Sequence, residues 1–275
     1  MRTRTRPALR TVLTAVVGGL LAALALVPSA RADGHDLTPP EILAVSVNGG
    51  RPVVVGPRHS LTFPVTVVAR ADAGIHRHGV EVVLWGPGDR VGSPRQELFG
   101  LDAPAPGCSP TSATTAVCTE WFRIDSGSAR VTNDWAGSWT VRALVASNNL
   151  REHPERSITI ERFPDAFNLQ RKSRLTFVAT PNPLPLGRSL GLFGRLLAAD
   201  WELNRYTGRS GETVELQFCA SPCRMVESVR SLGTGVAGFT GTSYPATRDG
   251  SWWLRYRGGP MFSPTSSPGV RVDVV

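Results

Sequence analysis

Leu61-Thr62-Phe63-Pro64-Val65-Thr66-Val67-Val68 decides the fold class, because its apolar residues recur at every second position. Side chains of a β-strand point alternately to its two faces, so this spacing predicts a strand with one face on a core. Turn-forming Gly, Pro, Asn and Asp separate further runs of this kind. These runs cover residues 80–85, 139–145, 158–163, 175–179, 190–194, 214–218, 252–256 and 270–274. We therefore predict an all-β protein with antiparallel sandwich sheets.

The predicted strands fall into two groups, separated where the apolar pattern lapses and charge rises. We expect one sandwich in residues 38–163, a linker in 164–172 and a second sandwich in 173–275. Each group contains a late Gly-Ser-Trp that opens a strand, which is compatible with duplication. Short strands with closely spaced turns are typical of immunoglobulin-like sandwiches, so we predict two of them in tandem.

Two segments depart from the alternation. Residues 86–117 are rich in Gly, Pro, Ser and Thr, which predicts a long connection with an edge strand at Glu97–Leu101. The stretch Arg195–Asn204 has a helix-like composition, and we expect one or two helical turns there.

Residues 1–32 have the order of a secretory signal peptide. Arginines without any acidic residue precede an apolar run at 12–27, and Pro28 follows it. Ala30 and Ala32 place small residues at the two positions that signal peptidase reads, which predicts cleavage after Ala32. The run is shorter than the roughly 20 apolar residues of a bilayer span, so a retained anchor is the weaker alternative. We expect a secreted protein with no transmembrane segment in the mature chain.

Export changes the interpretation of the charge. Residues 1–32 contain five arginines and no acid, so their removal lowers the net charge from +8 to +3. The remainder has no basic run of the kind that follows a phosphate backbone, which argues against nucleic-acid binding. We expect a monomer whose partner is a protein or glycan of the cell envelope, released or held there by noncovalent contacts.

The cysteines form two local pairs in the sequence, Cys108 with Cys118 and Cys219 with Cys223. Four cysteines allow three pairings. We expect the local one, because each pair lies in a short turn-rich segment and the exterior is oxidising. A zinc site at the second pair is disfavoured, since zinc needs further soft ligands and no histidine follows His153.

No common hydrolase motif surrounds the histidines, so we expect no catalytic residues and no enzyme. A hydrolase without a recognisable motif is the alternative. The seven tryptophans favour binding. If Trp252 is a core residue, Trp253 must face away with Arg255 and Arg257 beside it. These three are the candidate ligand-binding residues, for an acidic glycan or a protein, although the stripe could equally pack against the first domain.

The opening Val45-x-Val47-Asn48-Gly49-Gly50-x-Pro52-Val53-Val54-Val55-Gly56 resembles the start of secreted two-domain proteins of actinomycetes. The second half adds Asp200-Trp201-Glu202, Tyr206-Thr207-Gly208 and Asp249-Gly250-Ser251-Trp252. Together they resemble actinobacterial secreted proteins with tandem bacterial immunoglobulin-like domains, whose function is uncharacterised and some of which are labelled calcium-binding. The resemblance implies no enzymatic activity and no agreed ligand.

Within this resemblance, Asp72 matches the acidic turn that such modules carry after their second strand. Calcium takes six to eight oxygen ligands, usually from several carboxylates. A plain turn-forming Asp is therefore the main expectation for Asp72, and a calcium site is the weak alternative. No other cofactor is expected.

Overall fold

The alternating runs of the sequence form strands, and these make four sheets in the computed structural model, which describes residues 38–87, 96–101 and 104–275. The predicted signal peptide, with Ala30 and Ala32, lies outside these residues. In the described part of the chain, no helix is long and apolar enough to cross a membrane. The described residues form one compact unit.

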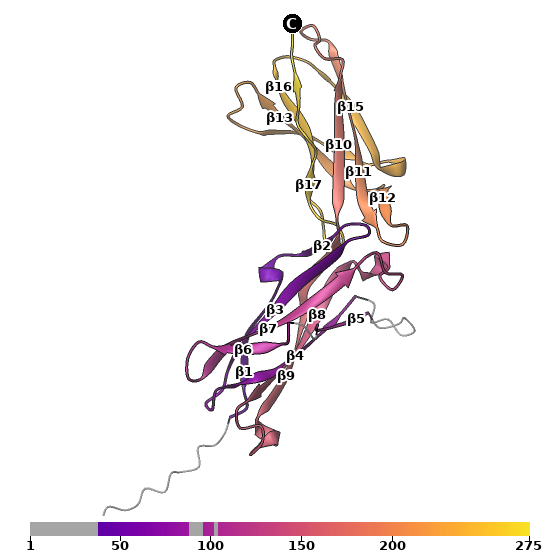
Figure 1. Cartoon of the computed structure of the whole chain (residues 1–275). Helices are drawn as coiled ribbons and strands as arrows, with labels where there is room; N and C mark the ends of the chain where they lie inside the picture. The colour runs from indigo at the N-terminus through magenta and orange to yellow at the C-terminus, as the bar shows by residue number, and fades with distance from the viewer. Residues whose placement is uncertain (1–37, 88–95, 102–103) are drawn as a thin grey trace, which may run out of the picture. The chain divides into compact units, whose positions relative to one another are not determined.

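Two sheets enclose the first core (Figure 1). One has the strand order β1 (Glu41–Val47), β3 (Ser60–Arg70), β7 (Thr115–Asp125), β6 (Gly107–Pro110). The other has the order β2 (Val53–Val55), β9 (Ile158–Arg171), β8 (Gly137–Ser147), β4 (Ile75–Trp85), β5 (Glu97–Phe99). All pairs are antiparallel except β2 with β9, which is parallel.

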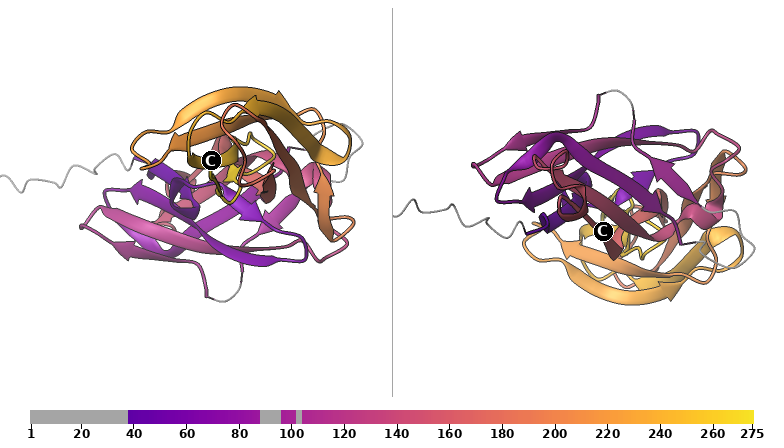
Figure 2. Two further views of the ribbon diagram at one scale, coloured as in Figure 1. Left: turned by 90° about the horizontal axis from the view of Figure 1, so that it is seen from above. Right: turned by 90° about the horizontal axis from the view of Figure 1, so that it is seen from below.

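Two further sheets enclose the second core. In one, β11 (Ser189–Asp200) pairs with its three neighbours, β10 (Ser173–Thr180), β12 (Arg205–Gly208) and β15 (Phe239–Pro245). The other has the order β14 (Glu227–Gly233), β13 (Thr213–Ala220), β16 (Gly250–Tyr256), and β16 pairs further with β17 (Thr265–Ser266) and β18 (Val270–Val272). The yellow C-terminal end lies among these strands (Figure 2).

Both halves have the strand order of an immunoglobulin-like sandwich. In immunoglobulin lettering, the first sandwich has the sheet β1-β3-β7-β6 as A-B-E-D and the sheet β2-β9-β8-β4-β5 as A′-G-F-C-C′. In the second sandwich, β10-β11-β15 corresponds to A-B-E, and β14-β13-β16 followed by β17 and β18 corresponds to C′-C-F-G. The prediction of two tandem immunoglobulin-like sandwiches is therefore confirmed. The two Gly-Ser-Trp sequences open β8 and β16, which hold the same F position in the two sandwiches. Their tryptophans, Trp139 and Trp252, are core residues as expected.

Three local expectations differ from the structure. Residues 164–171, expected in the linker, continue β9, because their backbone pairs with β8 and β2. Residues 195–200, expected to be helical, belong to β11, where pairing with strands on both sides outweighs the helix propensity of Leu and Ala. The expected edge strand is β5, and the same connection also contains β6, which was not expected.

Both local disulfides are present. Cys108 and Cys118 face each other across the β6–β7 hairpin. Cys219, near the end of β13, is bonded to Cys223 in the turn that follows. Each disulfide lies wholly within one sandwich.

Glu120 places a carboxyl group inside the first sandwich. It occupies an inward position of β7 between the core residues Cys118 and Phe122, and it is only 5% exposed. Its Oε2 accepts a hydrogen bond of 2.7 Å from the N–H of Val82 in the opposite sheet. Burial raises the pKa of Glu120 from 4.5 to about 7, against the lowering effect of this hydrogen bond.

The raised pKa predicts a pH-dependent stability. The folded state holds the Glu120 proton more tightly than the unfolded state, so its stabilising effect is complete below about pH 4.5 and is lost as the pH rises through about 7. We expect the free energy of unfolding to fall by on the order of 2 kcal/mol more in the wild type than in Glu120→Gln between pH 5 and pH 8. Urea unfolding of both proteins across this range measures the difference. Parallel pH profiles would contradict the assignment.

Candidate functional site

The stripe predicted on β16 lies on the outer face of the second sandwich. Trp253 pairs in register with Gln217 of β13, and Arg255 with Glu215. Trp253 is half-buried and its Nε1 donates a hydrogen bond of 2.7 Å to Gln217 Oε1. Its polar atom therefore already has a partner.

The two arginines of this stripe differ in their contacts. Arg257 is exposed and bonds Glu215 Oε1, with Nη2 at 2.6 Å and Nε at 2.7 Å. Arg255 is exposed and has no ion pair among the described residues. The structure thus brings Trp253, Arg255 and Arg257 onto one face, but it leaves only Arg255 open for a ligand.

Asp72 lies in the turn between β3 and β4. The N–H of Gly74 donates to the carbonyl of Ala71, which closes the turn. Asp72 Oδ2 accepts a hydrogen bond of 3.0 Å from Thr38 Oγ1. Within the described ranges, no three His, Cys, Asp or Glu side chains gather as a metal site. Calcium at Asp72 stays a prediction that these contacts do not support.

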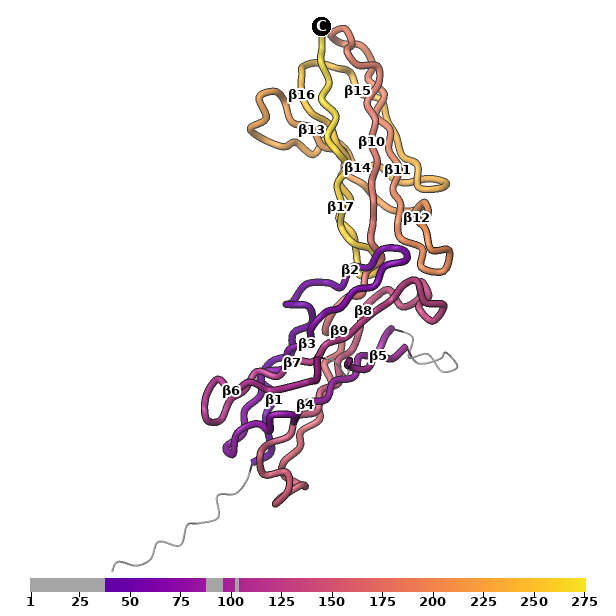
Figure 3. The backbone as a smooth tube through the Cα atoms, viewed as in Figure 1, coloured from indigo at the N-terminus to yellow at the C-terminus, as the bar shows by residue number. Residues whose placement is uncertain are grey.

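A network of polar contacts lies where β9 passes into β10. Only Lys172 separates the two strands, and Figure 3 shows the backbone running from one into the other. The N–H of Lys172 donates to the carbonyl of Val55, and its carbonyl accepts from the N–H of Ala199, both at 2.8–2.9 Å. The connection between the sandwiches is therefore hydrogen-bonded on both sides.

Trp201, in the turn after β11, is buried against the first sandwich. It is 1% exposed and belongs, with Ala199, to the core cluster of the first sandwich. Its Nε1 donates to the carbonyl of Val55 at 3.3 Å. Tyr206 packs against the same cluster. The core of the first sandwich is thus completed by side chains of the second.

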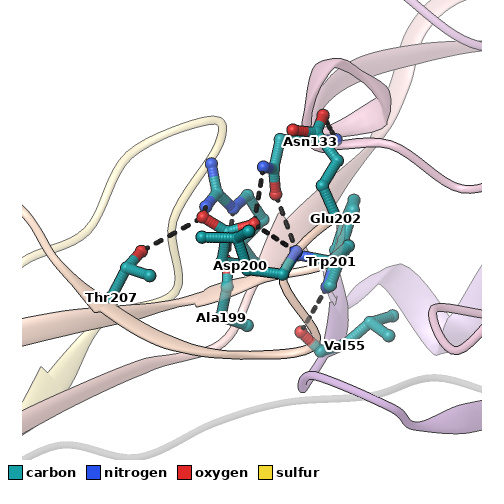
Figure 4. A network of polar contacts seen from close by, with 9 residues as sticks. Val55, Asn133, Ala199, Asp200, Trp201, Glu202 and Thr207 are labelled. Carbon is teal, nitrogen blue, oxygen red and sulfur yellow. Dashed lines mark hydrogen bonds and ion pairs between the residues drawn. The ribbon is translucent and has the colours of Figure 1, made fainter.

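Asn133 connects the same turn to the loop before β8 (Figure 4). Its Nδ2 donates to Asp200 Oδ1 and its Oδ1 accepts from the Trp201 N–H, each at 3.0 Å. Its own backbone N–H donates to Glu202 Oε1, also at 3.0 Å. Three hydrogen bonds from one residue fix the turn relative to the first sandwich.

A buried cation completes the network. Arg171 ends β9, and its Nε donates to the carbonyl of Ala199 at 2.5 Å while Nη2 lies 3.9 Å from Asp200 Oδ2. Burial lowers the pKa of Arg171, and the charge of Asp200 opposes this effect. Burial also raises the pKa of Asp200, but the hydrogen bonds from Asn133 and the Leu203 N–H, together with Arg171, bring it below its ordinary value. The lowered pKa of Asp200 favours its carboxylate form beside the Arg171 guanidinium.

Sequence reasoning missed this junction. Asp200-Trp201-Glu202 contributes only to the resemblance, and no pattern around Asn133 or Arg171 predicts a contact between the sandwiches. An isolated Trp between two acids in a turn is the one feature that could have indicated a buried anchor.

No family model matches the chain, and no curated protein matches it. Among solved structures, the full ectodomain of mouse nectin-like molecule 4 matches over 86% of this chain and 65% of its own, with 13% identity and a TM-score of 0.28. The D00-D0 domain of intimin matches over 83% and 99%, with 11% identity and a TM-score of 0.27. The Escherichia coli adhesin FdeC matches over 84% and 63%, with 15% identity and a TM-score of 0.30. Because these TM-scores are low, we base the assignment of the fold on the sheet topology and not on these matches.

Trp201 and the nearby Leu203, which is 55% exposed, form a matched pair for testing the junction. Trp201→Ala removes a side chain that both sandwiches share, so we expect a loss of about 3–5 kcal/mol and the separation of one thermal transition into two. Leu203→Ala should change stability by less than about 0.5 kcal/mol. Differential scanning calorimetry measures both. A single, unshifted transition in Trp201→Ala would show that the sandwiches are not coupled through this residue.

Proposed function

We propose that the mature protein is a non-catalytic binding protein that acts outside the cell. The predicted signal peptide and the two disulfides, which an oxidising compartment allows to form, support the location. The hydrogen-bonded junction supports a role in which the two sandwiches present their surfaces as one unit.

Large apolar side chains on outward sheet positions carry the proposal of binding. Phe99 in the first sandwich is 65% exposed, and Phe193 and Phe239 in the second are 53% and 59% exposed. Ile160 of β9 is also exposed. Phe193 of β11 and Phe239 of β15 lie in adjacent rows on one face of their sheet, and neighbouring exposed aromatic residues are typical of a surface that contacts a partner. A purely structural spacer has no need of it.

Carbohydrate is the second candidate, as a particular ligand within this function. Trp253 supports it less than the sequence suggested, because its indole N–H is bonded within the protein. Exposed aromatic rings elsewhere on the second sandwich support it more.

The export proposal predicts a defined N-terminus. When the full chain is expressed in a bacterial host with general secretion, the protein recovered outside the cytoplasm should begin at Asp33, because Ala30 and Ala32 precede the cleavage point. N-terminal sequencing or intact mass measures this. Ala32→Trp should accumulate as the longer precursor. Recovery of the uncleaved wild-type chain in the membrane fraction would contradict the proposal.

The binding proposal predicts that the purified mature protein sediments with isolated envelope material of its own source. The unfolded, reduced protein serves as the control for nonspecific adhesion. We expect the folded protein alone to be retained and to leave a panel of glycans and peptides uncleaved. Turnover of any member of that panel would overturn the non-catalytic assignment, and absence of retention would overturn the binding assignment.

A further inference from the structure

The outer face of the sheet formed by β10, β11 and β15 carries an unusual set of side chains. These strands lie side by side (Figure 1), and their register places residues in rows across the sheet. The three central rows are Thr176, Arg195, Phe239; Val178, Phe193, Gly241; and Thr180, Gly191, Ser243. The face therefore combines aromatic rings, small hydroxyl residues and glycine around one arginine.

The ring of Phe193 lies against the backbone of two glycines. A Cβ atom at Gly191 would be 2.7 Å from Phe193 Cε2, and a Cβ at Gly241 would be 2.6 Å from Cδ1. The ring thus covers both positions, and it remains 53% exposed. Because neither glycine has a side chain, nothing at these two positions projects from the sheet beside the ring. The result is an open, flat aromatic platform.

The charge of this face has one sign. Arg174 and Arg195 occupy outward positions of β10 and β11, and no outward position of β10, β11 or β15 carries a carboxylate. The Arg195 guanidinium lies 4.8 Å from the centre of the Phe239 ring, and its Nε donates to the carbonyl of Ala237 at 2.9 Å. These contacts hold Arg195 beside the platform without neutralising it, and no ion pair to it exists among the described residues.

We infer that this face binds an acidic polysaccharide, with a sugar ring on Phe193 and an acidic group of the same chain at Arg195. The inference rests on the proposed function and names its ligand class. The negative face of an aromatic ring attracts the weakly positive C–H groups of a pyranose, and a guanidinium binds a carboxylate, sulfate or phosphate through paired hydrogen bonds. Thr180 and Ser243 place hydroxyl groups within the same rows for the sugar hydroxyls.

The flatness of the face favours a glycan over a protein partner. Protein hot spots are aromatic or arginine side chains in packed pockets, surrounded by residues that exclude water. At Gly191 and Gly241, no side chain encloses the ring of Phe193 in this way. A sugar ring needs only one open aromatic face, and its remaining hydroxyls stay in water.

Matched polysaccharides and variants test the inference. The probes are polygalacturonate, dextran sulfate and a teichoic acid, with neutral galactan and dextran, single-stranded DNA and polyglutamate as controls. Phe193→Leu keeps an apolar group over the two glycines but removes the ring. Arg195→Gln removes one positive charge from this face, and Arg224→Gln removes one from the exposed turn between β13 and β14 as its control.

We expect the wild type to bind at least one acidic polysaccharide more tightly than any control. Phe193→Leu and Arg195→Gln should each weaken this binding about tenfold, which corresponds to about 1.4 kcal/mol, with unchanged melting temperatures. Arg195→Gln should also reduce the salt dependence, and Arg224→Gln should change affinity less than about twofold. Affinity electrophoresis and isothermal titration calorimetry measure these values.

Three outcomes would overturn the inference: no acidic polysaccharide bound, equal binding of polyglutamate or single-stranded DNA, or full affinity in Phe193→Leu. If these variants still sediment with envelope material like the wild type, the site is wrong while the proposed function stands. If the wild type binds neither envelope material nor polysaccharide, both proposals fail.

Discussion

The passage of β9 into β10 through a single residue is the constraint on which the arrangement of the second sandwich depends. The N–H of Lys172 is hydrogen-bonded to the first sandwich and its carbonyl to the second, so both ends of this one-residue connection are fixed. The end of β11 must then meet the first sandwich. Trp201 enters that core, and Asn133 and Arg171 satisfy the polar groups that the meeting buries. A buried charge such as Arg171 is tolerable only with such partners.

Much of the fold follows from local alternation, and the rest depends on contacts that one strand cannot reveal. The runs around Phe63, Trp139 and Trp252 predicted their strands and core positions because each face has a consistent polarity. Residues 195–200 misled, since Arg-Leu-Leu-Ala-Ala suits a helix and only neighbouring strands decide otherwise. The linker expected at residues 164–172 was wrong for the same reason. Residues 164–171 belong to β9, and the polar outward residues of a long strand resemble a loop in the sequence.

For the candidate site, too, alternation predicts which way a side chain faces but not which residue it contacts. Alternation correctly placed Trp253 opposite Trp252, but it could not show that Gln217 engages the indole N–H. The same rule, applied to Leu192 and Gly194, would have placed Phe193 outward as well. What the sequence could not provide was the register that sets Phe193 beside Gly241, since this depends on pairing with a strand almost fifty residues away. Glu120 is comparable, because its partner Val82 lies in the opposite sheet.

Both disulfides join cysteines that are close in the sequence, with separations of ten and four residues. In the export that we propose, Cys108 and Cys118 leave the translocation channel before Cys219 and Cys223, so each cysteine can bond its partner without competition from the other pair. In that proposed order, oxidation of each pair as it emerges gives the connectivity that the structure has. Loops this short restrict the unfolded chain only modestly. In the proposed export, their larger effect is on the order in which the disulfides form.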